Sequence, residues 1–419
     1  MPTRPDTLHH HIRQMGGRDP HEAHRVATPL ELLFDLTFVM CFGLAAVQYG
    51  HALAEGHYAV ALIGFGFASF AICWAWVNYS WFASAYDTDD WIFRVSTMVQ
   101  MSGVLVLAIG LPRMFATLEH GEHLDNTIMV LGYVIMRLAM VFQWLRAARQ
   151  DPSRRRICLT YAVAISTAQI GWIALSFSDL TLGATFAVIV ILVLIEMTGP
   201  IIAERRGEGT PWHAHHIAER YGLFAIIALG EGVVGTVAAL SAVIEAQGWT
   251  MNTALVCIAG TGLTFGMWWT YFILPSAQIL HVRRDKAFVW GYAQMATVAS
   301  IVATGAGLHV AANFIEHETH IGPLATVLTV AIPLSIFIGS VYALYTYLLG
   351  TFDRFHYWLL AATTAVVALA IAAAVSGADM AVCLVILMFA PAVTVVGYET
   401  RGYRHQLNAV THQKVEPAD

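Results

Sequence analysis

Acidic side chains stand inside segments of this chain that are otherwise apolar. Near the start of the first such segment, Glu31 and Asp35 are four residues apart, so a helix would place both on one face. Glu231 falls close to the middle of the seventh apolar segment, and Glu196 in the last third of the sixth. A charge at the centre of a bilayer costs about 2.5–3.5 kcal/mol on insertion scales, so buried carboxylates are expected to face a partner or a water-filled cavity.

Basic residues inside these segments are fewer than acidic ones. Arg137 falls near the middle of the fourth segment, at the same expected depth as Glu231, so these two charges are predicted to pair. Glu219 and Arg220 stand at the start of the seventh segment. A surplus of buried acid is typical of proton relays and cation sites. The sequence therefore predicts an ion or proton pathway through one set of residues: Glu31, Asp35, Arg137, Glu196, Glu219, Arg220 and Glu231.

A structural interpretation of the same charges stays open. Glu31 and Glu219 would then stabilise the first turns of their helices, where a carboxylate complements the helix dipole. Arg220 would extend to the headgroups, and Arg137 with Glu231 would form a fixed strut. The glycines around Glu231 permit either close helix packing or a break in the helix.

Four histidines in two connecting segments have a spacing that suits a metal ion. His120 and His123 follow the third apolar segment, and His317 and His320 follow the ninth. Two histidines three residues apart lie near one helical face and form a half-site for zinc, copper or nickel, and two half-sites could complete a four-ligand cage. The alternative is a pair of solvated, pH-sensitive loops. No cofactor other than such a divalent ion is expected.

The elements that must position these residues follow from composition. The chain has 419 residues, of which 58% are hydrophobic and only 12% charged, whereas an ordinary soluble domain carries roughly 25% charged residues. Lipid must therefore cover much of the surface, and membrane lipids and a small solute or ion are the expected partners. A formal net charge of −6 indicates no nucleic-acid partner.

Twelve segments are long and apolar enough to cross a bilayer, which takes roughly 20 residues each. They are residues 30–50, 58–82, 92–112, 126–146, 157–177, 180–203, 217–240, 251–274, 287–312, 321–349, 355–375 and 378–398. If the N-terminus is inside, the connecting segments on the outer side hold only Arg113, which is a strong positive-inside signal. The prediction is an all-α polytopic membrane protein with both termini cytoplasmic, a mobile tail at residues 1–27 and a second tail at residues 404–419.

Short motifs recur at a nearly constant offset. Trp76-Val77-Asn78-Tyr79 matches Trp268-Trp269-Thr270-Tyr271, and Gln100-Met101 matches Gln294-Met295. We therefore expect two parallel six-helix repeats, residues 28–206 and 207–403, with a site between them near the midplane. The alternative is that aromatic, glycine-rich membrane helices resemble each other by composition alone. Two parallel repeats can form a complete unit, so a homodimer is possible but not required.

Two longer motifs resemble a known family. Residues 28–39, TPLELLFDLTFV, and residues 219–231, ERYGLFAIIALGE, look like the two signatures of the bacterial low temperature requirement protein A family. The resemblance covers roughly residues 25–401. It implies a multi-pass protein of the bacterial inner membrane, connected by the family name with growth in the cold, and it implies no defined activity.

Three kinds of function are compatible with these features. The chain has no nucleotide-binding loop between strand and helix, so an ATP-driven pump is not favoured. The favoured hypothesis is a secondary transporter or an ion or proton pathway that uses buried acids between the repeats, rather than an enzyme. The alternatives are an intramembrane enzyme or lipid-active factor for cold adaptation, and a non-catalytic membrane scaffold or sensor.

Overall fold

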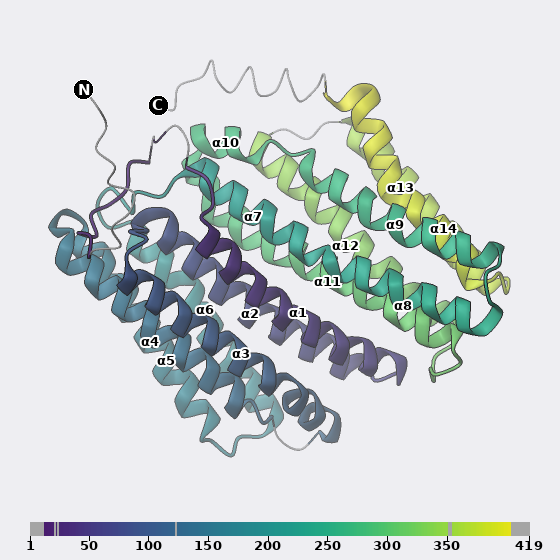
Figure 1. Cartoon of the computed structure of the whole chain (residues 1–419), viewed down its shortest axis with the longest axis horizontal. Coiled ribbons are helices and arrows are strands. Elements are labelled where there is room, and N and C mark those ends of the chain that lie inside the picture. Colours follow the sequence, from purple (N-terminus) through teal and green to yellow (C-terminus); the bar gives the residue numbers. More distant parts are fainter. Residues whose placement is uncertain (1–11, 21, 23–24, 122–123, 351–353, 404–419) are drawn as a thin grey trace. The chain divides into compact units, whose positions relative to one another are not determined.

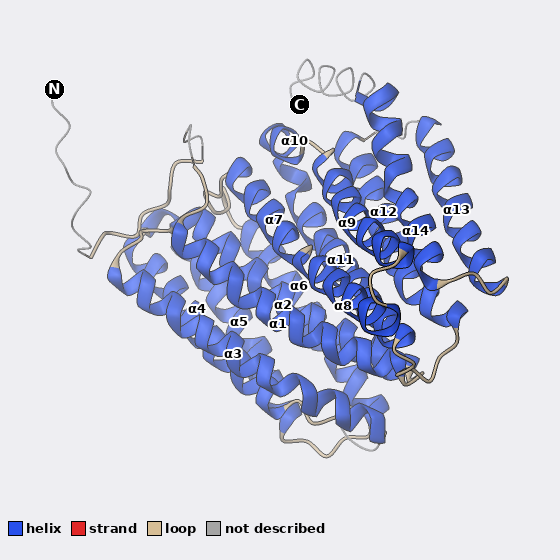
Figure 2. Cartoon of the chain, turned by 45° about the vertical axis from the view of Figure 1, so that its right-hand side comes forward, coloured by secondary structure: helices blue, strands red, loops and turns tan. Residues whose placement is uncertain are grey.

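The chain folds almost entirely into helices (Figure 1). The computed structural model describes residues 12–20, 22, 25–121, 124–350 and 354–403. Within these residues no strand is present, and short loops join the helices (Figure 2). The α-helices are α1 (Pro29–Ala54), α2 (Tyr58–Tyr86), α3 (Trp91–His120), α4 (Thr127–Gln150), α5 (Arg155–Ser176), α6 (Leu182–Glu204), α7 (Ala214–Ala228), α8 (Gly230–Gln247), α9 (Met251–Phe272), α10 (Ser276–Val282), α11 (Ala287–Ile315), α12 (Pro323–Leu349), α13 (Arg354–Val375) and α14 (Met380–Gly397).

Twelve helical stretches in the described part of the chain are long and apolar enough to span a membrane. Two of them are interrupted: α7 and α8 form one stretch, Ala214–Gln247, and α9 and α10 form another, Met251–Val282. The prediction of an all-α polytopic membrane protein with twelve spans is confirmed. The repeat arrangement and the side on which the termini lie stay predictions.

Contacts divide the chain into two compact units. Unit 1 comprises residues 1–41 and 74–217, and unit 2 comprises residues 42–73 and 218–419. Inside unit 1, α3 packs on α4, α4 on α5, and α5 on α6; inside unit 2, α8 packs on α9 and α11, α11 on α12, and α14 on α9 and α13. The units interleave along the chain, whereas the predicted repeats divide it once.

Small residues bring the helices of each unit close together. At the α3–α4 contact, a Cβ added to Gly132 would lie 2.8 Å from the Cα of Leu107, and one added to Gly103 would lie 2.7 Å from the carbonyl oxygen of Gly132. Lipid tails are as apolar as leucine, so membrane helices associate through close packing rather than through the hydrophobic effect. The lack of a side chain at these glycines therefore lets α3 and α4 pack closely against each other.

The described part of the N-terminal tail is bound to unit 1, which differs from the mobile tail that we expected. The backbone N–H of Met15 donates to Oε1 of Gln150 at 2.7 Å, and Met15 is fully buried. The backbone N–H of Arg18 donates to the carbonyl oxygen of Ala85 at 3.0 Å. These bonds join residues far apart in the chain, so the tail's polar composition alone did not predict them.

Candidate functional site

A polar cavity of about 530 Å³ lies in unit 1. The N-terminal tail forms one part of its wall, and the loop between α2 and α3 forms another. The charged side chains of the wall are three arginines and three acids. The full lining is Arg13, Gln14, Gly16, Arg18, Glu22, Arg25, Val26, Thr28, Asp87, Thr88 and Asp89.

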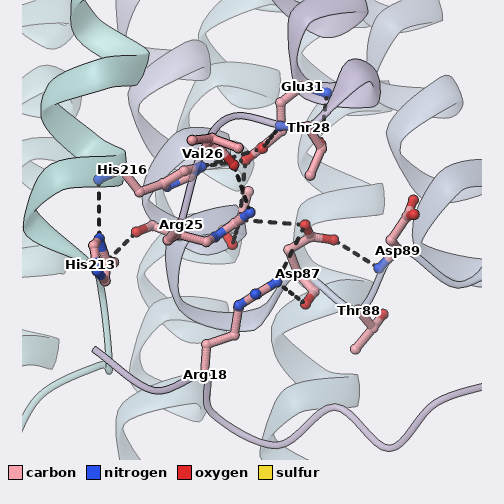
Figure 3. A network of polar contacts seen from close by, with 12 residues as sticks. Arg18, Arg25, Val26, Thr28, Glu31, Asp87, Thr88, Asp89, His213 and His216 are labelled. Atoms are coloured by element: carbon pink, nitrogen blue, oxygen red, sulfur yellow. Dashed lines mark hydrogen bonds and ion pairs between the residues drawn. The ribbon is translucent and has the colours of Figure 1, made fainter. Parts of the chain in front are cut away.

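Asp87 is the buried acid of this wall (Figure 3). Its Oδ2 lies 3.4 Å from Nη2 of Arg25 and 3.9 Å from Nη1 of Arg18, and its Oδ1 accepts from the backbone N–H of Asp89 at 2.8 Å. Burial and the nearby negative charge of Glu31 raise the pKa of Asp87 to about 6, against the opposing effect of Arg25. Asp87 therefore changes its protonation state close to neutral pH.

Glu31 lies next to this acid and is completely buried. Its Oε2 accepts from the backbone N–H of Thr28 at 2.7 Å, while the backbone N–H of Glu31 donates to Oγ1 of Thr28 at 3.3 Å. This reciprocal pair is a capping box at the start of α1. Glu31 therefore does cap its helix, as the structural interpretation of the sequence expected.

The capping contacts are only part of the surroundings of Glu31. Its Oε1 lies 3.6 Å from Nη2 of Arg25 and 3.1 Å from Nε2 of His216, which is also fully buried. His216 stands 185 residues further along the chain. A cap requires no histidine, so this contact gives Glu31 a second role as a member of a buried charged cluster.

His213 extends the cluster toward the tail (Figure 3). Its Nδ1 accepts from the backbone N–H of His216 at 3.2 Å, and its Nε2 lies 2.8 Å from the carbonyl oxygen of Glu22. Because Nδ1 accepts, a neutral ring carries its hydrogen on Nε2 and donates it to Glu22. Burial lowers the pKa of His213, against the hydrogen bond to Glu22, so the neutral ring is favoured.

These contacts form one connected group, which we call the tail cluster: Arg18, Arg25, Glu31, Asp87, His213 and His216. It runs from the partly exposed Arg18 to the fully buried Glu31 and His216. A carboxylate and an imidazole within 3.1 Å of each other can exchange a proton, and the guanidinium of Arg25 stabilises the negative charge that remains.

Asp35 lies one turn beyond Glu31 on α1 and is also fully buried. Its Oδ1 accepts from Nε1 of Trp76 on α2 at 2.7 Å. Both predicted acids of the first span are therefore shielded inside unit 1.

Arg137 pairs with Glu196 rather than with Glu231, the partner that we expected from depth. Nη2 of Arg137 lies 2.7 Å from Oε2 of Glu196, and Nε1 of Trp172 donates to the other carboxylate oxygen at 3.0 Å. Tyr133 completes the cluster, since its hydroxyl contacts both the arginine and the glutamate. Both oxygens of Glu196 are thus satisfied, which indicates a fixed structural pair between α4 and α6.

The three other predicted acids and bases lie in unit 2. Arg220 is fully buried and Glu219 is half-buried, both on α7. Glu231 stands in the first turn of α8, directly after the helix break at Leu229. Among the described residues its carboxylate has neither an ion pair nor a hydrogen bond. A Cβ added to Gly43 would lie 2.9 Å from Oε1 of Glu231, so glycine on α1 makes room for this carboxylate.

The predicted metal ligands are only partly described. His123 and the side chain of His120 lie outside the described residues. Nδ1 of His320 lies 2.7 Å from Oε2 of Glu55. Among the described histidines, cysteines and acids, no group of three or more could hold a metal ion. A metal site that includes His317 and His320 therefore stays a prediction.

Several residues of the site were not among those predicted. Asp87 is one of three aspartates in residues 87–90, between two apolar segments, and such a cluster is a usable signal. Its neighbour Asp90 accepts from Nη1 of Arg146 at 3.0 Å. Arg25 gave no signal, because it stands in a polar tail and its partners are distant in the chain.

Comparison with known proteins places the chain in a family. The family model for the bacterial low temperature requirement A protein matches residues 26–391. An uncharacterized protein of Rhizobium meliloti (strain 1021) is 25% identical over 296 residues, which cover 66% of this chain and 67% of that protein. No solved structure matches. Because the family model covers most of the chain, including both signature motifs and the helices that hold Glu31 and His216, this protein belongs to the bacterial low temperature requirement A family.

Proposed function

We propose that this protein is a secondary transporter or ion pathway of the bacterial inner membrane, and that it moves protons through the tail cluster. The observation that carries the proposal is the contact between Glu31 and His216, two fully buried titratable side chains 3.1 Å apart. Burial of a carboxylate requires compensation, and Arg25 and the histidine supply it in a form that can bind and release a proton.

A route to solvent supports the proposal. Asp87 lines the cavity, contacts Arg25, and has its pKa raised to about 6 by burial and by Glu31. A proton taken up at Asp87 is therefore separated from Glu31 only by the guanidinium of Arg25. Arg25 stays protonated and holds both acids in place, and Glu31 does not line the cavity, so the proton passes between the carboxylates by movement of the side chains.

The arrangement of charges supports an orientation. The cavity wall contains Arg13, Arg18 and Arg25, and the positive-inside tendency favours arginine-rich connecting segments on the cytoplasmic side. The cavity is then the cytoplasmic entrance, and Asp35, one turn further along α1, is the next acid toward the membrane centre.

A matched pair of histidine variants tests the proposal. The protein is reconstituted into liposomes that contain a pH-sensitive dye, and proton flux is measured under an imposed pH gradient. His216→Gln should reduce the flux per molecule at least tenfold, because it removes the buried imidazole. His215→Gln should not, since His215 is exposed. Equal flux in both variants, or no flux from the wild type above that of empty liposomes, would refute the proposal.

A further inference from the structure

The cavity in unit 1 is lined by three arginines and three acids, but these charges do not all pair with one another. Among its acids, Glu22 lies 2.8 Å from Arg18, and Asp87 lies 3.4 Å from Arg25. The third acid, Asp89, is bound through both oxygens by Arg94, which does not line the cavity, at 2.8 and 2.9 Å.

Arg13 is the remaining charge of the wall. In the described ranges no carboxylate lies within ion-pair distance of its guanidinium; its Nη1 reaches only the carbonyl oxygen of Thr88, at 3.5 Å. One positive charge of the wall therefore has no counter-charge among the described residues.

Two hydrogen-bond donors of the same wall are also unused. Nε of Arg25 and Oγ1 of Thr88 are buried, and within the described part of the chain neither has a hydrogen-bond partner. Both residues line the cavity. A buried donor without an acceptor destabilises the protein, and a bound group that accepts hydrogen bonds removes that cost.

We propose that the cavity binds a small solute carrying a carboxylate or phosphate group, held by Arg13, Arg25 and Thr88. Guanidinium groups form paired, charge-assisted hydrogen bonds with such oxyanions. The volume of about 530 Å³ lies within the range of small-molecule sites. The inference rests on the proposed function in one respect: it names the solute that would accompany the proton.

Oxyanion binding and protonation of Asp87 should favour each other. The charged groups that face Asp87 are Arg18 and Arg25 from the tail, Glu31 from α1 and Arg94 from α3, together with the backbone N–H of Asp89. When Asp87 is neutral, Arg25 loses a competing anion and attracts the ligand more strongly. Its pKa of about 6 then predicts tighter binding as the pH falls from 7.5 to 5.5. By linkage, binding of the oxyanion raises the pKa of Asp87 and takes up a proton.

Calorimetry on the purified full-length protein tests this inference without measuring transport. The protein is placed in phosphatidylcholine nanodiscs and titrated at pH 5.5 and 7.5 with dimethyl phosphate and with lactate, two anions that keep a single negative charge over this range. The wild type should bind at least one of these anions, several-fold more tightly at pH 5.5. Two buffers of different ionisation enthalpy should reveal proton uptake during binding at pH 7.5.

Three variants test which residues bind the anion and which residue causes the pH dependence. Arg13→Gln, at an exposed position, should weaken binding about tenfold at both pH values. Asp87→Asn should bind at pH 7.5 as tightly as the wild type does at pH 5.5, and should lose the pH dependence. Arg113→Gln serves as the control, because Arg113 pairs with Asp125 and does not line the cavity. Its affinity should equal that of the wild type.

The remaining outcomes are also decisive. If phosphatidylglycerol nanodiscs weaken dimethyl phosphate binding by the wild type but not by Arg13→Gln, the natural oxyanion is a lipid headgroup rather than a free solute. No binding of any probe, or binding that neither Arg13→Gln nor Asp87→Asn alters, overturns the inference. Anion binding without proton flux would overturn the proposed function alone, and proton flux without anion binding would overturn this inference alone.

Discussion

Substitution of Glu31 by glutamine separates proton movement from helix capping. The amide oxygen of glutamine can still accept from the backbone N–H of Thr28, so the capping contact at 2.7 Å is retained. The negative charge that faces Arg25 at 3.6 Å and His216 at 3.1 Å is lost. The substitution therefore removes the group that we propose to bind the proton and changes the shape of the site very little.

The expected cost in stability follows from what remains around Arg25. Removal of one partner from a buried ion pair costs about 3–5 kcal/mol when the other charge is left uncompensated. Here the guanidinium keeps Asp87 at 3.4 Å and the carbonyl oxygens of Ala83 and Val26. We therefore expect a smaller loss, about 1–3 kcal/mol of unfolding free energy.

Flux and stability are to be measured on the same preparation. Proton flux per reconstituted molecule should fall at least tenfold in Glu31→Gln, although most of the protein stays folded, as thermal melting in detergent would show. Glu245→Gln, a substitution of an exposed glutamate on α8, provides the control for reconstitution. A Glu31→Gln protein with wild-type flux would refute the reasoning, and so would a flux loss no larger than its loss of folded protein.

Three further predictions concern stability. Asp87 has a pKa of about 6 in the folded protein against 3.8 as an ordinary value, so its negative charge opposes folding at neutral pH, and this effect disappears as the pH falls below about 4. Because one pKa unit corresponds to 1.36 kcal/mol, Asp87→Asn should stabilise the protein by up to about 3 kcal/mol at pH 7.5 and by less at pH 5. Melting curves of the variant and the wild type that show no such pH dependence would contradict this pKa. Arg137→Gln should cost about 3–5 kcal/mol because it leaves Glu196 buried without its charge partner, and a double substitution with Glu196→Gln should cost less than the sum of the two; additive losses in a double-mutant cycle would argue against a fixed pair. Gly132→Ala should lower stability by about 1–3 kcal/mol because its Cβ would lie 2.8 Å from the Cα of Leu107, whereas Gly66→Ala, with no atom within 4 Å of the added Cβ, should have little effect; equal melting temperatures for these two variants would refute the packing argument.

The membrane spans could be predicted because hydropathy depends on local composition. The segment expected at residues 58–82 is α2, and the segment expected at 321–349 is α12. The expected burial of Glu31 and Asp35 followed from the cost of a charge in lipid, and both side chains are fully buried. The helix break at Leu229 stayed one of two alternatives, because such a break depends on packing as well as on glycine.

The partners of the buried charges could not be predicted in the same way. Depth along a helix fixes one coordinate, whereas contact also depends on the direction in which each side chain points and on which helices are neighbours. Depth alone joined Arg137 to Glu231, but the neighbouring helices α4, α5 and α6 bring Arg137 to Glu196 and Trp172. The tail cluster could not be predicted for a related reason, since Arg25 and Asp87 are 62 residues apart in the sequence.

The most direct test of the account is the proton flux carried by the wild-type protein itself. Sealed proteoliposomes are given a membrane potential by potassium and valinomycin, and internal acidification is followed against protein-free liposomes of the same lipid. If the buried contact between Glu31 and His216 conducts protons, acidification should rise in proportion to the amount of reconstituted protein. Acidification equal to that of protein-free liposomes, at every protein density tested, would contradict the account.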